Sequence, residues 1–268
     1  MAHPEPITPG TRATGTQGTL PLVATAIHAG HDLRPEVADL MALDAPDRLR
    51  EEDPHTDRIA AGVETHVLVR RSRFEVDLNR PPEEAVYLEP EHCWGLDVWK
   101  ERPHDGIVAG SLELYDRFYA ELAERLDPLA AQGPFVVFDV HSYNHRREGP
   151  DGPPAPQDEN PDVNVGTGSM DRGRWAAGVD TFLGSLHGTE VVGRPLDVRE
   201  NVRFRGANLC RWVHERYPDT GCALALEFKK TFMDEWTGEV DQAHLAELSA
   251  VLAAVAPVVA DAARRGRP

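Results

Sequence analysis

The sequence predicts an α/β fold, in which a central, mostly parallel or mixed sheet lies between helices on both faces. Short apolar runs typical of buried strands alternate with longer segments whose apolar residues recur about every 3.6 positions. The chain has 268 residues, enough to bury one large core, and it contains no internal repeat. We therefore expect a single domain over residues 20–268, preceded by a flexible leader at residues 1–19, which are rich in Pro, Gly and Thr.

The strand candidates are apolar runs bounded by Gly, Pro or polar residues. The three strongest lie at residues 20–27, 135–141 and 221–228. Shorter candidates complete the predicted sheet, at residues 65–69, 74–78, 163–167 and 190–192.

The clearest helix candidate lies at residues 111–129, where Leu112, Tyr115 and Leu122 fall on one apolar face. Further helices are expected at residues 36–43, 55–64, 172–186, 208–217 and 241–264. The segments left as loops are a charged one at 44–54, a long one rich in Pro and Gly at 144–162, and a polar one at 194–205. Long loops inside compact domains often act as lids, which makes residues 144–162 a candidate lid.

The chain is acidic, with 28 Lys and Arg residues against 45 Asp and Glu residues and a formal net charge of −17. This charge argues against nucleic acid or an anionic membrane as the main partner. No window approaches 18 consecutive apolar residues and no signal pattern opens the sequence, so we expect a cytoplasmic protein. The cysteines, Cys93, Cys210 and Cys222, lack metal-type spacing and are expected to be free thiols.

Three of the predicted strands end in a residue suited to metal chemistry, namely His28, His141 and Glu227. In open α/β sheets such strand ends can converge at one edge. A catalytic zinc takes three ligands from His, Asp or Glu and keeps a fourth position for water. Asp53, which follows the first strand's loop, can supply the missing carboxylate, with Asp57 as its rival.

Glu227 is then free to act as a general base, taking a proton from water and passing it to a leaving amine. His31 and His55 remain alternative ligands or supporting groups. The structural alternative is that each strand-end histidine is a satisfied core residue and that Glu227 pairs with an arginine.

A second cluster follows at residues 72–81. Alternation along the predicted strand places Arg73, Glu75 and Asp77 on one face, with Asn79 and Arg80 leaving its end. A guanidinium binds a carboxylate in a bidentate manner, so Arg80 beside Asn79 forms a candidate clamp for an acidic substrate. Alternatively, Asp77 pairs with an arginine and anchors the turn.

A third basic group consists of Arg203, Arg205 and Arg211. Arg205, followed by a glycine, is a candidate contact for an anionic ligand, or the group is a solvated face.

Seven blocks of the sequence, in the same order, resemble those of the N-formylglutamate amidohydrolase family. They cover residues 21 to about 235 and read Ile27-His28-Ala29-Gly30, Asp53-Pro54-His55, Ser72-Arg73 with Asp77-Leu78-Asn79-Arg80-Pro81, Asp139-Val140-His141-Ser142, Asn164-Val165-Gly166-Thr167, Asn201 to Arg205-Gly206, and Leu226-Glu227 to Phe232-Met233-Asp234-Glu235. The sequence departs from the family pattern at Ile27, Pro54 and Ala207, where Pro, Trp and Gly are common.

The resemblance implies a fold similar to the zinc carboxypeptidases and aspartoacylases, with one zinc per chain. It implies that His28, an acidic residue near position 53 and His141 bind the metal, and that Glu227 is the general base. It also implies that Arg73, Asn79 and Arg80 contribute to binding the substrate carboxylate.

These observations together predict a zinc-dependent amidohydrolase acting on a small N-acylated acidic amino acid, with N-formyl-L-glutamate as the default substrate. Glu227 and Arg73 are the expected catalytic residues, with one of the arginine side chains neutralising the oxyanion, while Asn79, Arg80 and Arg205 bind substrate. One alternative is a carboxypeptidase-like enzyme acting on a peptide, and another is a non-catalytic binding module. The oligomeric state is not predicted.

Overall fold

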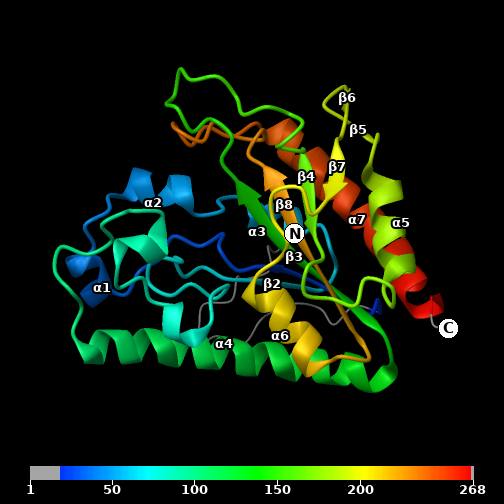
Figure 1. Ribbon diagram of the computed structural model, residues 1–268, viewed down its shortest axis with the longest axis horizontal. Coiled ribbons are helices and arrows are strands. Elements are labelled where there is room, and N and C mark those ends of the chain that lie inside the picture. The colour runs from blue at the N-terminus through cyan, green and yellow to red at the C-terminus, as the bar shows by residue number, and fades with distance from the viewer. Residues whose placement is uncertain (1–18, 267–268) are drawn as a thin grey trace, which may run out of the picture.

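The computed structural model describes residues 19–266 and consists of three layers (Figure 1). A six-stranded sheet lies between two groups of helices, one on each face. The expected leader lies outside the described residues except for Thr19. The three cysteines are free and buried, as expected.

The sheet has the strand order β2-β1-β3-β8-β4-β7, and every neighbouring pair is parallel except β8 and β4. The predicted mixed, mostly parallel sheet is therefore confirmed. The central strands β3 and β8 are each nine residues long and consist mainly of buried apolar side chains. The strands span Leu22–Ala26 (β1), His66–Leu68 (β2), Phe135–Tyr143 (β3), Val163–Gly166 (β4), Val198–Glu200 (β7) and Gly221–Lys229 (β8).

One face of the sheet is covered by α4 and α6, and the other by α3, α5 and α7 (Figure 1). By length and composition α7 is apolar enough to cross a membrane, but its apolar residues, among them Leu248 and Leu252, form part of the protein core. These helices span Thr56–Ala60 (α3), Asp105–Gln132 (α4), Ala176–Leu186 (α5), Asn208–Arg216 (α6) and Gln242–Arg265 (α7).

A smaller core joins α1 to the segment that follows β2, and Val37, Phe74 and Tyr87 are buried in it. This part of the molecule lies beside the carboxyl ends of the strands. Its helical elements are Pro35–Leu40 (α1), Ala45–Glu51 (α2) and the 3-10 helices Pro82–Glu84 (η1) and Pro90–Cys93 (η2).

Two of the predicted loops contain regular structure. Residues 44–54 were expected to be a charged loop, but they contain α2, because the Asp44 side chain accepts the Asp47 N–H at 2.9 Å and caps the helix. Residues 194–205 contain β7, whose main chain pairs with β4, and β6 (Arg194–Pro195), which pairs with β5 (Glu190–Val191).

The predicted strand at residues 74–78 is wrong. The carbonyl of Ser72 accepts the N–H groups of Glu75 and Val76, so the chain turns instead of extending. The carboxylates of Glu75 and Asp77 are fully buried and bind different partners. Arg73, Glu75 and Asp77 therefore do not lie along one face of a strand.

Candidate metal centre

His28, Asp53 and His141 meet at the carboxyl edge of the sheet. His28 follows β1 by two residues, His141 lies in β3, and Asp53 lies in the turn between α2 and α3. Their ligand atoms all lie within 4.8 Å of one another, and all three residues are buried. The Asp53 N–H donates to the carbonyl of His28 at 2.9 Å, which ties the turn to the end of β1.

The two imidazole rings present the same nitrogen to Asp53. The Nδ1 atoms of His28 and His141 lie 3.4 Å and 3.0 Å from Asp53 Oδ2. On the far side of each ring, His28 Nε2 lies 2.7 Å from Asp77 Oδ1, and His141 Nε2 lies 3.0 Å from Asp139 Oδ2. A carboxylate behind a histidine fixes its tautomer and orients its other nitrogen, an arrangement typical of metal-binding histidines.

This donor set fits a metal ion. Within residues 19–266, the buried Nδ1 of His28 has no hydrogen-bond partner, so its lone pair is available to a metal ion. Two imidazole nitrogens and a carboxylate oxygen are ligands that zinc accepts, and they leave a further coordination position open. Asp57, His31 and His55 are not part of the group: His31 Nδ1 instead binds Glu52 at 2.5 Å.

The charges within the group are strongly coupled. Burial alone would raise the pKa of Asp53, but the hydrogen bond from His141 and the nearby imidazole of His28 lower it below its usual range. Burial opposes protonation of His141, yet the neighbouring Asp139 and Asp53 raise its pKa well above its usual value. The pair therefore favours a carboxylate at Asp53, the form that binds a metal.

Glu227 lies beside the group on the adjacent strand, because the β3–β8 register pairs it with His141. Burial raises the pKa of Glu227 to about 7, and the charges of Asp53 and Asp139 add to the effect while His141 opposes it. In the described part of the chain, its carboxylate has no hydrogen bond or ion pair. A carboxyl group with these properties suits proton transfer near neutral pH.

Arg73 is linked through Asp77 to the candidate metal group, which consists of His28, Asp53 and His141. Its Nη2 donates to Asp77 Oδ2 at 2.8 Å, and its guanidinium lies 4.9 Å from the ring centre of Trp94. The hydroxyl of Tyr87 also donates to Asp77. The Arg73 guanidinium thus supports the carboxylate that orients His28.

Asn79 is held by α6. Its Oδ1 accepts the Leu209 N–H at 2.9 Å and its carbonyl accepts the Asn208 N–H at 3.3 Å, so it caps this helix. Its Nδ2 lies 3.2 Å from His141 Nε2. Arg80, the next residue, is partly exposed and has one distant ion pair, with Glu84 at 3.8 Å.

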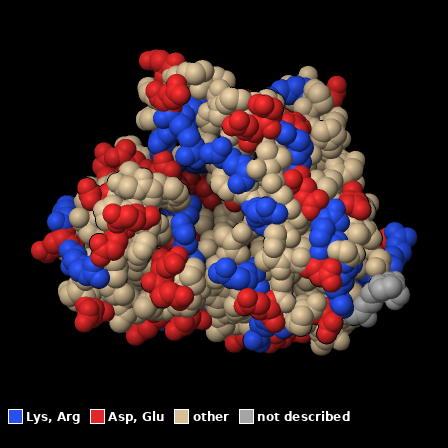
Figure 2. Space-filling model, in the orientation of Figure 1, with Lys and Arg blue, Asp and Glu red and all other residues tan. Residues whose placement is uncertain are grey.

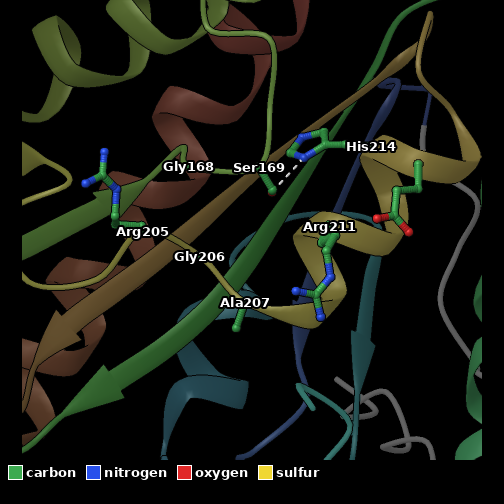
Figure 3. A pocket seen from close by; sticks show the side chains of 8 residues that line it. Gly168, Ser169, Arg205, Gly206, Ala207, Arg211 and His214 are labelled. Atoms are coloured by element: carbon green, nitrogen blue, oxygen red, sulfur yellow. Dashed lines mark hydrogen bonds between the residues drawn. The ribbon is translucent and has the colours of Figure 1, made fainter. Parts of the chain in front are cut away.

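Arg205 lines a pocket that shares no residue with the metal group (Figure 3). In that pocket Ser169 Oγ lies 2.9 Å from His214 Nδ1, while His214 Nε2 accepts the Ala223 N–H at 3.0 Å. Since Nε2 is an acceptor and burial lowers the His214 pKa to about 4, the ring proton sits on Nδ1 and is donated to Ser169. His214 therefore cannot remove a proton from Ser169.

Two buried residues beside the candidate metal group were not among the sequence candidates. Asp139 lies two positions before His141 in β3, so the two side chains share a face of the sheet, and this spacing was an available signal. Lys230 is only 1% exposed and lies against the turn that carries Asp53, a contact that no local pattern indicates.

The surface around the group is basic although the chain is acidic. Figure 2 shows a hollow over the carboxyl ends of β3 and β8, bordered by Lys and Arg side chains and with acidic atoms on its floor. Such a local field attracts small anions.

Comparisons with known proteins identify the family and support the fold. The model of the N-formylglutamate amidohydrolase family matches residues 20–233. The crystal structure of an N-formylglutamate amidohydrolase from Ralstonia eutropha JMP134 is similar in fold, with a TM-score of 0.72 and 18% identity over 94% of this chain and 97% of that one. A gene product from Agrobacterium tumefaciens gives a TM-score of 0.57 and 18% identity over 92% and 90% of the two chains. No curated protein matches the sequence. The chain belongs to the N-formylglutamate amidohydrolase family.

Proposed function

We propose that the protein is a zinc-dependent amidohydrolase that cleaves N-formyl-L-glutamate into formate and glutamate. The observation that carries the proposal is the convergence of His28, Asp53 and His141, with a carboxylate behind each imidazole ring. Membership of an amidohydrolase family supports the reaction class. The substrate is taken from the family and from the name of the similar Ralstonia eutropha enzyme.

His28, Asp53 and His141 would hold the zinc ion through two nitrogens and one oxygen. A zinc ion bound there supplies a Lewis acid for the amide carbonyl and lowers the pKa of a water molecule. Asp77 and Asp139 keep both Nδ1 atoms directed at Asp53.

Glu227 would move the proton during the reaction. Its carboxylate takes a proton from the water whose oxygen attacks the formyl carbon, and then donates it to the glutamate nitrogen as the C–N bond breaks. Its raised pKa and the absence of a hydrogen-bond partner for it among residues 19–266 support this role.

The substrate carboxylates would bind to the basic rim of the hollow in Figure 2. Among the residues that the structure describes, the Arg80 guanidinium has one distant ion pair, so most of its donors are available for a carboxylate. Arg73 is held by Asp77 near the metal group, and the oxyanion formed in the transition state is its proposed partner. Asn79 and Arg205 remain proposed substrate contacts.

The test is formate release from N-formyl-L-glutamate by wild type and by Glu227→Gln, with zinc content measured on the same samples. We expect wild type to release formate, and Glu227→Gln to retain zinc but lose at least about a hundredfold in kcat. Full activity in Glu227→Gln would remove the proposed base. If zinc-loaded wild type instead removes residues from peptides and releases no formate, the substrate is a peptide, as for a carboxypeptidase.

A further inference from the structure

Lys230 is a buried cation directly after β8, and its hydrogen-bond acceptors are main-chain carbonyls instead of carboxylates. Its side chain is almost completely inaccessible, and its Nζ donates to the carbonyls of Arg50 at 2.7 Å and Glu52 at 2.8 Å. A buried ammonium group is costly unless its donors are satisfied, so these two bonds determine where the side chain lies.

The two carbonyls belong to residues 50–53, which comprise the end of α2 and the start of the turn that presents Asp53. The Glu52 carbonyl and the Asp53 N–H are parts of one peptide unit, whose planarity makes them move together. Lys230 holds the oxygen of this unit at 2.8 Å, and the carbonyl of His28 accepts its N–H at 2.9 Å. The peptide that precedes the Asp53 side chain is thus fixed from both sides.

The same turn is also fixed from β3. Asn144, just after the end of that strand, donates its Nδ2 to the Arg50 carbonyl at 3.0 Å. The three strands that carry or precede His28, His141 and Glu227 therefore each contribute one hydrogen-bonding group to the turn that supplies Asp53.

We infer that Lys230 is a positioning residue that sets the affinity of the metal group, by holding the Glu52–Asp53 peptide unit against the end of β1. The inference rests on the proposed function, since it concerns the same metal group. A carboxylate ligand displaced from its position binds a metal less tightly, and losses of supporting contacts typically reduce metal affinity by about 10- to 100-fold.

The neighbouring lysine provides a matched control. Lys229 is also buried, at 4% exposure, but it points to the other side, where its Nζ lies 3.5 Å from Asp162 and donates to Gln157. No hydrogen bond or ion pair joins the Lys229 side chain to the turn at residues 50–53. Both lysine side chains are therefore buried, and only that of Lys230 holds the segment that supplies Asp53.

The experiment compares Lys230→Met and Lys229→Met in the full chain. Zinc dissociation constants are measured by competition with a chromophoric chelator, and the unfolding temperature of each metal-free protein is recorded. We expect Lys230→Met to bind zinc at least about tenfold more weakly than wild type and Lys229→Met to stay within about threefold. We also expect the Co²⁺ absorption bands, which report ligand geometry, to shift in Lys230→Met alone.

Wild-type affinity and an unchanged Co²⁺ spectrum in Lys230→Met would overturn the inference. If Lys230→Met does not fold, zinc affinity is measured in Asn144→Ala instead. This variant removes the other donor to the Arg50 carbonyl and involves no charged side chain. Weaker zinc binding in Asn144→Ala is then the expected result, and wild-type affinity contradicts the inference. If wild type itself binds no zinc, it is the proposed function that fails.

Discussion

The Nε2 atom of His28 lies 2.7 Å from Oδ1 of Asp77, a fully buried carboxylate. Arg73 donates to the other oxygen of Asp77, and the Asn79 N–H donates to Oδ1 at 2.7 Å. With these charged and polar partners around it, the pKa of Asp77 is held well below its usual range although burial opposes this. Asp77 is therefore a permanent acceptor for Nε2–H, and the His28 Nδ1 lone pair is left for a metal.

Asp77→Asn should lower zinc affinity by about 10- to 100-fold, because an amide neither fixes the His28 tautomer nor raises its basicity as a carboxylate does. Competition with a chelator measures the dissociation constant. Glu75→Gln is the control, since Glu75 is equally buried and two residues away but binds Arg34 instead of a histidine. Equal zinc affinities for Asp77→Asn and wild type would show that this carboxylate does not support the metal group.

Glu227 should make the metal-free protein less stable as the pH rises. Its pKa is about 7 in the folded protein against 4.5 for an ordinary glutamate, so the folded state holds the proton more tightly. The resulting stability is present below pH 4.5 and is lost as the pH rises through 7. Glu227→Gln has no such titration. Between pH 5 and pH 8 we therefore expect its free energy of unfolding to rise by up to about 3 kcal/mol relative to that of wild type.

Urea unfolding of both proteins with EDTA, at each pH, measures this difference. Glu190→Gln, at an exposed position in β5, should follow the wild-type pH dependence. The same pH dependence in wild type and Glu227→Gln would mean that Glu227 has an ordinary pKa.

Substitutions of Asn79 and Arg80 should differ in their effect on stability, because Asn79 also caps α6. Asn79→Ala removes the cap of α6 and should cost about 1 kcal/mol, or about 2–4 °C in unfolding temperature for a protein of this size. Arg80→Ala should leave that temperature unchanged and raise the KM for N-formyl-L-glutamate by about tenfold or more. Thermal unfolding and steady-state kinetics measure these two effects. An unchanged KM in Arg80→Ala would show that Arg80 does not bind the substrate.

Ser169→Ala should keep the wild-type rate of formate release. His214 donates its ring proton to Ser169, so this pair cannot generate a serine nucleophile. The kinetic constants of the variant provide the check. A loss of about a hundredfold or more would move the chemistry from the metal group to the pocket of Figure 3.

The strands that carry the site could be predicted because a strand buried on both faces is a continuous run of apolar residues. β1, β3 and β8 are runs of apolar residues, and their parallel pairing brings His28, His141 and Glu227 to one edge of the sheet. The choice between Asp53 and Asp57 could not be made from spacing. It depends on the turn between α2 and α3, which directs Asp53 toward the histidines.

The segment around Asp77 shows why other features escaped prediction. Apolar residues alternate at Phe74, Val76 and Leu78, as in a strand, but the carboxylates between them are buried by partners distant in sequence. Arg34 binds Glu75 and His28 binds Asp77, and these contacts form only once the chain has folded. Lys230 was missed for the same reason, because its acceptors are main-chain carbonyls about 180 positions away.

The most direct test of the metal group is the zinc content of wild type, Asp53→Ala and Asp57→Ala, measured by elemental mass spectrometry after purification without chelator. The two carboxylates are four residues apart, and only Asp53 lies with the histidines. We predict about one zinc per chain in wild type and Asp57→Ala, and almost none in Asp53→Ala. Stoichiometric zinc in Asp53→Ala, or its loss in Asp57→Ala, would contradict the metal group described here.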